Sequence, residues 1–98
     1  MSDTILKEKT TNKVQVPKMY KVILLNDDYT TMDFVIEILT NVFNKNEAEA
    51  IMIMLSVHRQ GKGVAGIYSL DIAQTKVKIV KDMAREHGHP LQLTIEVE

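Results

Sequence analysis

The sequence predicts an α+β domain of two layers, in which a three-stranded antiparallel sheet packs against three helices in the order β-α-α-β-α-β. Three observations predict this architecture. An aliphatic run precedes two amphipathic segments, a third amphipathic segment lies between two further strand-like runs, and the last run alternates strictly between apolar and polar residues. With 98 residues, the chain has room for one such core but not for two.

The first strand is expected over residues 19–26, where "MYKVILLN" is largely aliphatic and lacks glycine and proline. Thr30 can then cap the first helix, with Asp33 three residues later at the second position of a capping box. The helix is expected to end near Asn44. Its apolar residues recur at helical spacing and are Met32, Val35, Ile36, Leu39, Val42 and Phe43.

The second helix is expected to begin after Asn46, which can cap it together with Glu49. It is expected to end near residues 59–63, "RQGKG", where two glycines permit a tight exit. The inner face of this helix is predicted to hold Ala48, Ile51, Met52 and Leu55.

The remaining elements are a strand, a helix and a strand. Residues 64–70, "VAGIYSL", predict the second strand, and Ser69 can cap the third helix, which Gly88 and Pro90 end. The core-facing stripe of that helix is predicted to be Ile72, Ala73, Lys76, Val77, Val80, Met83, Ala84 and His87. Residues 91–98, "LQLTIEVE", alternate as expected of a strand with one wet face.

Composition excludes several classes of function. A net charge of −1 gives little attraction for phosphate backbones, so no nucleic-acid partner is expected. The absence of cysteine excludes disulfides and thiolate metal sites. The chain shows neither the apolar core of a signal peptide nor a membrane-spanning stretch, so a cytoplasmic location without membrane contact is expected. Residues 1–18 read as a flexible N-terminal extension of a core domain over residues 19–98.

The residues that could carry chemistry lie where predicted elements meet. Asn26, Asp27 and Asp28 follow the first strand, ahead of a helix. The second helix presents on one face Met54, Val57 and His58. A metal-dependent enzyme is disfavoured because no recognised ligand spacing occurs, and the motifs of hydrolases and phosphate-binding loops are absent. From the residues alone, a turn that caps a helix and a binding site for a cationic group both remain open.

Five separated blocks of the sequence resemble the ClpS adaptor family. They are "YKVILLNDDYTTMDFV", "MLSVH", "GKGVAGIY", "TKV" and "HPLQLTIE", and the similarity covers residues 19–98. Thr31 departs from the family pattern, which often has proline there, but proline at the first helical position only pre-sets the backbone. The resemblance implies an adaptor, not an enzyme, that delivers proteins with a free N-terminal Leu, Phe, Tyr or Trp to a Clp AAA+ protease.

The resemblance also implies the site residues. The substrate's α-amino group would be bound by Asn26, Asp27, Asp28 and His58. Its first side chain would enter a pocket formed by Thr30, Met32, Val35, Met54, Val57 and Leu91. The N-terminal domain of a ClpA- or ClpC-like unfoldase would dock on Asp71, Thr75 and Lys76. The unfoldase itself would engage residues 1–18 during delivery.

No metal, cofactor or second copy of the chain is expected. The alternative from another class is a non-catalytic interaction module with the fold of the ribosomal stalk protein's C-terminal domain. Such a module would have no need for the amide, the two carboxylates and the histidine, so binding of a free N-terminus distinguishes the two functions.

Overall fold

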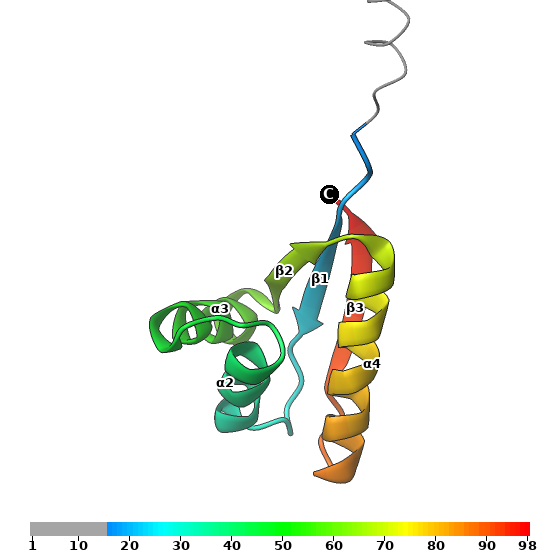
Figure 1. The fold of residues 1–98 in the computed structure, drawn as a ribbon. Coiled ribbons are helices and arrows are strands. Elements are labelled where there is room, and N and C mark those ends of the chain that lie inside the picture. The colour runs from blue at the N-terminus through cyan, green and yellow to red at the C-terminus, as the bar shows by residue number, and fades with distance from the viewer. Residues whose placement is uncertain (1–15) are drawn as a thin grey trace, which may run out of the picture.

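A computed structural model describes residues 16–98 as a three-stranded antiparallel sheet with helices packed against one face (Figure 1). The elements in chain order are β1 (Tyr20–Leu25), α2 (Met32–Asn41), α3 (Glu47–Gln60), β2 (Lys62–Tyr68), α4 (Leu70–Glu86) and β3 (Gln92–Val97). The predicted fold class is confirmed. Most of the expected N-terminal extension lies outside the described residues. Within residues 16–98, no helix has the length and apolarity needed to cross a membrane.

Strand β1 is the central strand of the sheet, whose order is β2-β1-β3, and it runs antiparallel to both neighbours. At its last residue, Leu25 lies opposite Lys62 of β2 and Gln92 of β3. The end of β1 and the beginnings of β2 and β3 therefore lie together at one end of the sheet. The register shifts between Val22 and Ile23, and Ala65 of β2 is the extra residue of a bulge that the sequence did not predict.

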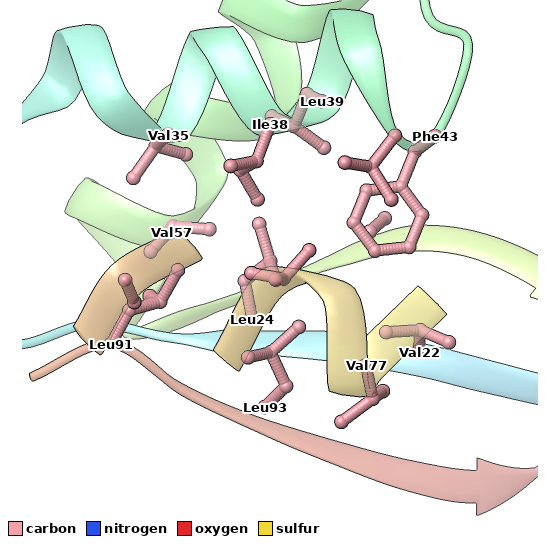
Figure 2. Close-up of a cluster of buried hydrophobic side chains, with 14 of the residues drawn as sticks. Val22, Leu24, Val35, Ile38, Leu39, Phe43, Val57, Val77, Leu91 and Leu93 are labelled. Carbon is pink, nitrogen blue, oxygen red and sulfur yellow. The ribbon is translucent and has the colours of Figure 1, made fainter. Parts of the chain in front are cut away.

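The core lies between the sheet and the helices. Val22 and Leu24 of β1 are fully buried, and Figure 2 shows side chains of α2 pointing toward Leu24. Burial of each such side chain contributes about 1.5–3 kcal/mol. The buried residues of α2 are Phe34, Val35, Ile38 and Leu39. This layer fixes α2 over the sheet, and with it the loop that joins β1 to α2.

The N-terminal cap of α2 differs from the prediction. The backbone N–H of Phe34 donates to the hydroxyl of Thr31 at 3.1 Å, so Thr31 is the cap rather than Thr30. Thr30 is instead bound by the carboxylate of Asp27. Proline at position 31 could not supply this hydroxyl, so the departure from the family pattern provides a capping group.

Helix α3 begins as predicted but faces the core with other residues. Asn46 and Glu49 form a complete capping box, with hydrogen bonds of 2.8 and 3.0 Å. The predicted inner face is wrong: Ile51 and Met52 are exposed, as is Ala48, and Leu55 is half-buried. The buried residues are Ala50, Met54 and Val57. The helix lies against α2 and β2 through this second face.

Helix α4 follows the predicted stripe in its middle but not at its ends. Ala73, Val77, Val80 and Ala84 are buried, whereas both predicted outer members of the stripe, Ile72 and His87, are exposed. Ser69 occupies the N-cap position, but its side chain makes no capping hydrogen bond. Gly88 follows the helix in the left-handed region, at a φ of 73°, as expected of a helix stop.

Candidate functional site

The candidate site lies where the end of β1 meets the end of α3. The backbone N–H of Asn26, just after β1, donates to the carbonyl of Gly61 at 2.9 Å. Gly61 is the left-handed cap that ends α3, with a φ of 89°. Because His58 lies in the last turn of α3, this bond between two loops brings its ring close to the residues that follow β1.

Asp27 holds the loop between β1 and α2 in shape. One oxygen of its carboxylate accepts the backbone N–H groups of Tyr29 and Thr30 at 2.8 and 2.6 Å. The other oxygen accepts the hydroxyl of Thr30 at 2.7 Å. Partial burial alone would raise the pKa of Asp27, but these hydrogen bonds, together with the charge of His89, hold it below its ordinary value. The loop thus uses both oxygens of this carboxylate.

Asp28 has different surroundings from its neighbour. Its side chain is exposed, and its carboxylate has no hydrogen-bond partner within residues 16–98. Asn26 and His58 are also exposed. An amide oxygen, a carboxylate and an imidazole nitrogen are all acceptors, so these three residues can receive the N–H groups of a cation.

The predicted binding residues surround one cavity of about 300 Å³, called here the substrate cavity. Nine of the ten line it: Asn26, Asp27, Asp28, Thr30, Met32, Val35, Met54, Val57 and His58. Val35, Met54 and Val57 are buried and make its inner walls apolar, whereas Met32 is 46% exposed at the rim. The cavity thus combines an apolar interior with a polar, negatively charged mouth.

Leu91 is the predicted pocket residue that does not line the substrate cavity. It is buried in the same core cluster as Val35 and Val57, and Figure 2 shows it beside Val57. Its exposed surface contributes to a neighbouring cavity between α4 and β3. In this structure Leu91 therefore supports the wall of the substrate cavity from behind.

The predicted partner surface forms a separate shallow cavity of about 240 Å³ on α4. Asp71, Thr75 and Lys76 line it, together with Ile72 and Ile79. These two isoleucines are 49% and 44% exposed. The sequence wrongly predicted that Ile72 faces the core. The surface thus combines one acidic, one basic and two apolar side chains.

Lys76 has a structural contact as well. Its ammonium donates to the carbonyl of Val42 at 2.6 Å, just past the end of α2. The same ammonium lies 5.2 Å from the ring centroid of Tyr68 and 5.9 Å from that of Phe43. Lys76 therefore joins α4 to α2, and its replacement is expected to affect stability as well as any partner.

Two histidines beside the site, His87 and His89, were not predicted from the sequence to be site residues. The ring centroids of His87 and His89 lie 5.6 and 4.5 Å from that of Phe34 on α2. Within the described residues no group of three or more histidines and acids could hold a metal ion. The contact ties the end of α4 to the beginning of α2, next to the substrate cavity.

Comparison with known proteins gives concordant results. Residues 15–94 match the family model described as ATP-dependent Clp protease adaptor protein ClpS. The chain is 58% identical to the ATP-dependent Clp protease adapter protein ClpS of Acetivibrio thermocellus, with 97% of this chain and 96% of the relative covered. It is 57% identical to that of Clostridium acetobutylicum, with 95% and 90% covered.

A solved structure is similar over most of the chain. It is that of Agrobacterium tumefaciens ClpS2 bound to L-phenylalaninamide, with a TM-score of 0.80 and 44% sequence identity. The similarity covers 85% of this chain and 100% of the other.

Proposed function

The chain belongs to the ClpS family of ATP-dependent Clp protease adaptor proteins, which are not enzymes, and on this premise we propose that it recognises substrates by their first residue. The substrates would carry a free α-amino group and an N-terminal Leu, Phe, Tyr or Trp, and they would be delivered to a Clp AAA+ protease. The observation that carries this proposal is the substrate cavity, which is apolar inside and negatively charged at its mouth.

The mouth of the cavity suits a protonated α-amino group. An ammonium has three N–H donors and one positive charge, so it needs several acceptors and a negative field. Asn26, Asp28 and His58 offer such acceptors, and Asp28 offers a carboxylate that the loop does not use. Hydrogen bonds to a charged group contribute about 1.5–3 kcal/mol each. Acetylation would remove the charge and two donors, so a blocked N-terminus is expected to bind poorly.

The interior of the cavity suits one large apolar side chain. A volume of about 300 Å³ lies at the lower end of the range for ligand pockets. Burial of a Leu or Phe side chain contributes about 1.5–3 kcal/mol. At the upper end of these ranges, three hydrogen bonds and one buried side chain contribute about 12 kcal/mol, and an association cost of about 4 kcal/mol leaves about −8 kcal/mol, or a Kd of about 1 μM.

The ligand of the similar solved structure supports this chemistry. L-phenylalaninamide, bound to the Agrobacterium ClpS2, presents a free α-amino group and a benzyl side chain, and it lacks a carboxylate. It therefore resembles the first residue of a longer peptide. The proposed cavity is suited to the same two groups.

Fluorescence anisotropy tests the recognition. We expect a labelled peptide that begins with Phe to bind. The same peptide with an acetylated N-terminus, and the same peptide with Gly in place of Phe, should not bind. His58→Ala should weaken the binding of the first peptide while the circular dichroism spectrum stays unchanged. Equal binding of all three peptides would instead favour an interaction module that does not read N-termini.

For the protease partner, we propose that the α4 surface docks on the N-terminal domain of a ClpA- or ClpC-like unfoldase. Asp71, Thr75 and Lys76 would supply polar contacts, and the exposed pair Ile72 and Ile79 would supply apolar area. A monomeric state and a cytoplasmic location stay predictions.

Titration of the protein with the N-terminal domain of a ClpA-like unfoldase, and separately with that of a ClpC-like unfoldase, tests this surface. The variant Asp71→Ala should lose binding of the unfoldase domain and keep its affinity for the Phe peptide. Glu86→Ala, an exposed acid at the other end of the same helix, is the matched control. Lys76 is a poor choice because it also bonds Val42. Unchanged unfoldase binding by Asp71→Ala would show that the surface is misplaced.

A further inference from the structure

A cavity between α4 and β3 carries positive charge and belongs to neither proposed site. Its volume is about 420 Å³. Buried Ala84 and Leu93, with Leu91, provide its apolar residues, and Lys81, Arg85 and His89 provide its basic ones. Among residues 16–98, no carboxylate lines it. We call this cavity, completed by Pro90 and Gln92, the basic groove.

The charges of the basic groove are available to a ligand. The Arg85 guanidinium lies 3.5 Å from the carboxylate of Asp82, but the two side chains are 80% and 48% exposed. Exposed pairs of this kind contribute little, because water and salt screen them. Lys81 makes no ion pair within residues 16–98. An acidic ligand would therefore not have to displace a strong internal partner.

A third cavity connects the basic groove with the substrate cavity. It has a volume of about 500 Å³ and shares Asn26, Asp27 and Asp28 with the substrate cavity. It shares Pro90 and Gln92 with the basic groove. The three cavities are thus adjacent on the surface. Acidic residues line the substrate cavity and the connecting cavity, and basic residues line the basic groove.

The spacing along this path can be estimated from the strand register. Leu25, next to Asn26, lies opposite Gln92 on the adjacent strand. Adjacent strands are about 4.8 Å apart, and an extended chain advances about 3.3 Å per residue. One strand spacing, with a further distance of about 10 Å between packed layers to the basic side chains of α4, gives a path of about 15 Å from the mouth of the substrate cavity. A substrate whose first residue fills that cavity would therefore reach Lys81 and Arg85 with about its fourth to sixth residues. Strand β3 is an edge strand of the sheet, so an extended chain can approach it from outside.

We infer that the basic groove binds acidic side chains about four to six residues after the substrate's first residue, and so adds a second element of substrate choice. The inference rests on the proposed function, since the first residue must occupy the substrate cavity. Exposed charge pairs each contribute little, so we expect three acids together to improve affinity about threefold to tenfold.

Three labelled peptides test the inference. All begin with Phe and are otherwise neutral, and they carry Glu, Gln or Lys at the fourth, fifth and sixth residues. With the unmodified protein, we expect the Glu peptide to bind about threefold to tenfold tighter than the Gln peptide, and the Lys peptide to bind weakest. The difference should shrink at about 0.5 M salt, because the charges lie at the surface.

Charge reversal assigns the preference to the basic groove. The double variant Lys81→Glu, Arg85→Glu should abolish or invert the order of the three peptides. The control variant Lys18→Glu, Lys78→Glu changes the net charge equally, and neither residue lines the groove, so it should keep the order. L-phenylalaninamide, which reaches only the substrate cavity, should compete equally well against all variants.

The possible results separate this inference from the proposed function. Equal affinities for the Glu and Gln peptides, with Phe-dependent binding intact, would overturn the basic groove alone. A Glu preference that survives in the double variant would overturn it too, because the acids would then bind elsewhere. Loss of all Phe-dependent binding in the unmodified protein would overturn both.

Discussion

Asp27 and Asp28 are neighbours at the mouth of the substrate cavity, yet the structure gives them different tasks. Asp27 accepts three hydrogen bonds from Tyr29 and Thr30, which fold the loop. Asp28 accepts none within residues 16–98 and faces solvent. The first carboxylate therefore stabilises the loop, and the second is the one that can meet a cationic ligand.

The division between the two acids can be tested by removing one charge at a time. Asp28→Asn should weaken binding of a Phe-initiated peptide about tenfold, the loss of one hydrogen bond to a charged group, and should leave stability unchanged. Asp27→Asn should lower the free energy of unfolding by about 1 kcal/mol. Anisotropy and urea denaturation measure the two quantities. Equal effects of both variants on stability would contradict the assignment.

The pH dependence of stability provides a second test at the residue scale. The pKa of Asp27 is lowered from 3.8 in the folded protein, so the folded state favours the ionised form. Its contribution is fully present above the unfolded value and is lost as pH falls through the lower, folded value. The stability difference between the unmodified protein and Asp27→Asn should be constant from about pH 7 to 5 and should shrink near pH 3. An undiminished difference at the lower pH would exclude this explanation.

At the scale of elements, the substrate cavity depends on how closely β2 approaches α3. A Cβ atom at Gly63 would lie 2.9 Å from a methyl carbon of Val57 and 3.1 Å from the carbonyl oxygen of Ile53. Only glycine lets the strand pack at this distance. Because Val57 is a wall of the substrate cavity, the position of the strand also sets the shape of the cavity.

Gly63→Ala is therefore expected to act on both stability and binding. Separation of β2 from α3 should cost about 1–3 kcal/mol of unfolding free energy, and the shift of Val57 should weaken binding of the Phe peptide. Val64→Ala is the control, because its exposed side chain points to the other face of the strand. If the two variants behaved alike in denaturation and anisotropy, the close approach would not matter.

The sequence predicted those elements whose signals are local. The capping box of Asn46 and Glu49 is formed by four consecutive residues, and it is present. The inner face of α3 was mispredicted because apolar residues occur almost all round that helix, as Met52 and Met54 illustrate on opposite sides. Packing against α2 and β2 selects the buried face, and the spacing of residues does not contain that information.

The candidate site shows the same limit. Thr30 and Thr31 are equally able to cap a helix, but Thr30 donates its hydroxyl to Asp27, and Thr31 accepts the capping hydrogen bond from Phe34. The cavity itself depends on the hydrogen bond between Asn26 and Gly61, which joins residues far apart in the chain. The residue types of the site could be recognised from the sequence, but the way they meet required the fold.

At the scale of the whole molecule, the two proposed surfaces lie toward opposite ends of the sheet. The substrate cavity lies at the end of β1, beyond Leu25. Tyr20 and Tyr68 pair at the other end, and α4 begins there, shortly before Asp71 (Figure 1). Six residues of β1 separate the two ends, which corresponds to roughly 20 Å. If the proposed surfaces are correct, a substrate and an unfoldase domain would therefore occupy different ends of the sheet.

Binding at the two surfaces is accordingly expected to be independent. Saturating amounts of the unfoldase domain should change the affinity for a Phe-initiated peptide by less than about twofold, a coupling free energy below about 0.4 kcal/mol. Isothermal titration with and without the domain measures this. A larger change would show that a conformational change links α4 with the loop after β1.

The hydrogen bonds around Asp27 have a kinetic consequence. Since the loop is already folded before any peptide arrives, encounter should need little rearrangement, and the association rate constant should reach about 10⁶–10⁷ per molar per second. With a Kd of about 1 μM, a captured peptide would then dwell for roughly 0.1 to 1 second. A bound peptide that does not meet the protease within that time would therefore dissociate into solution.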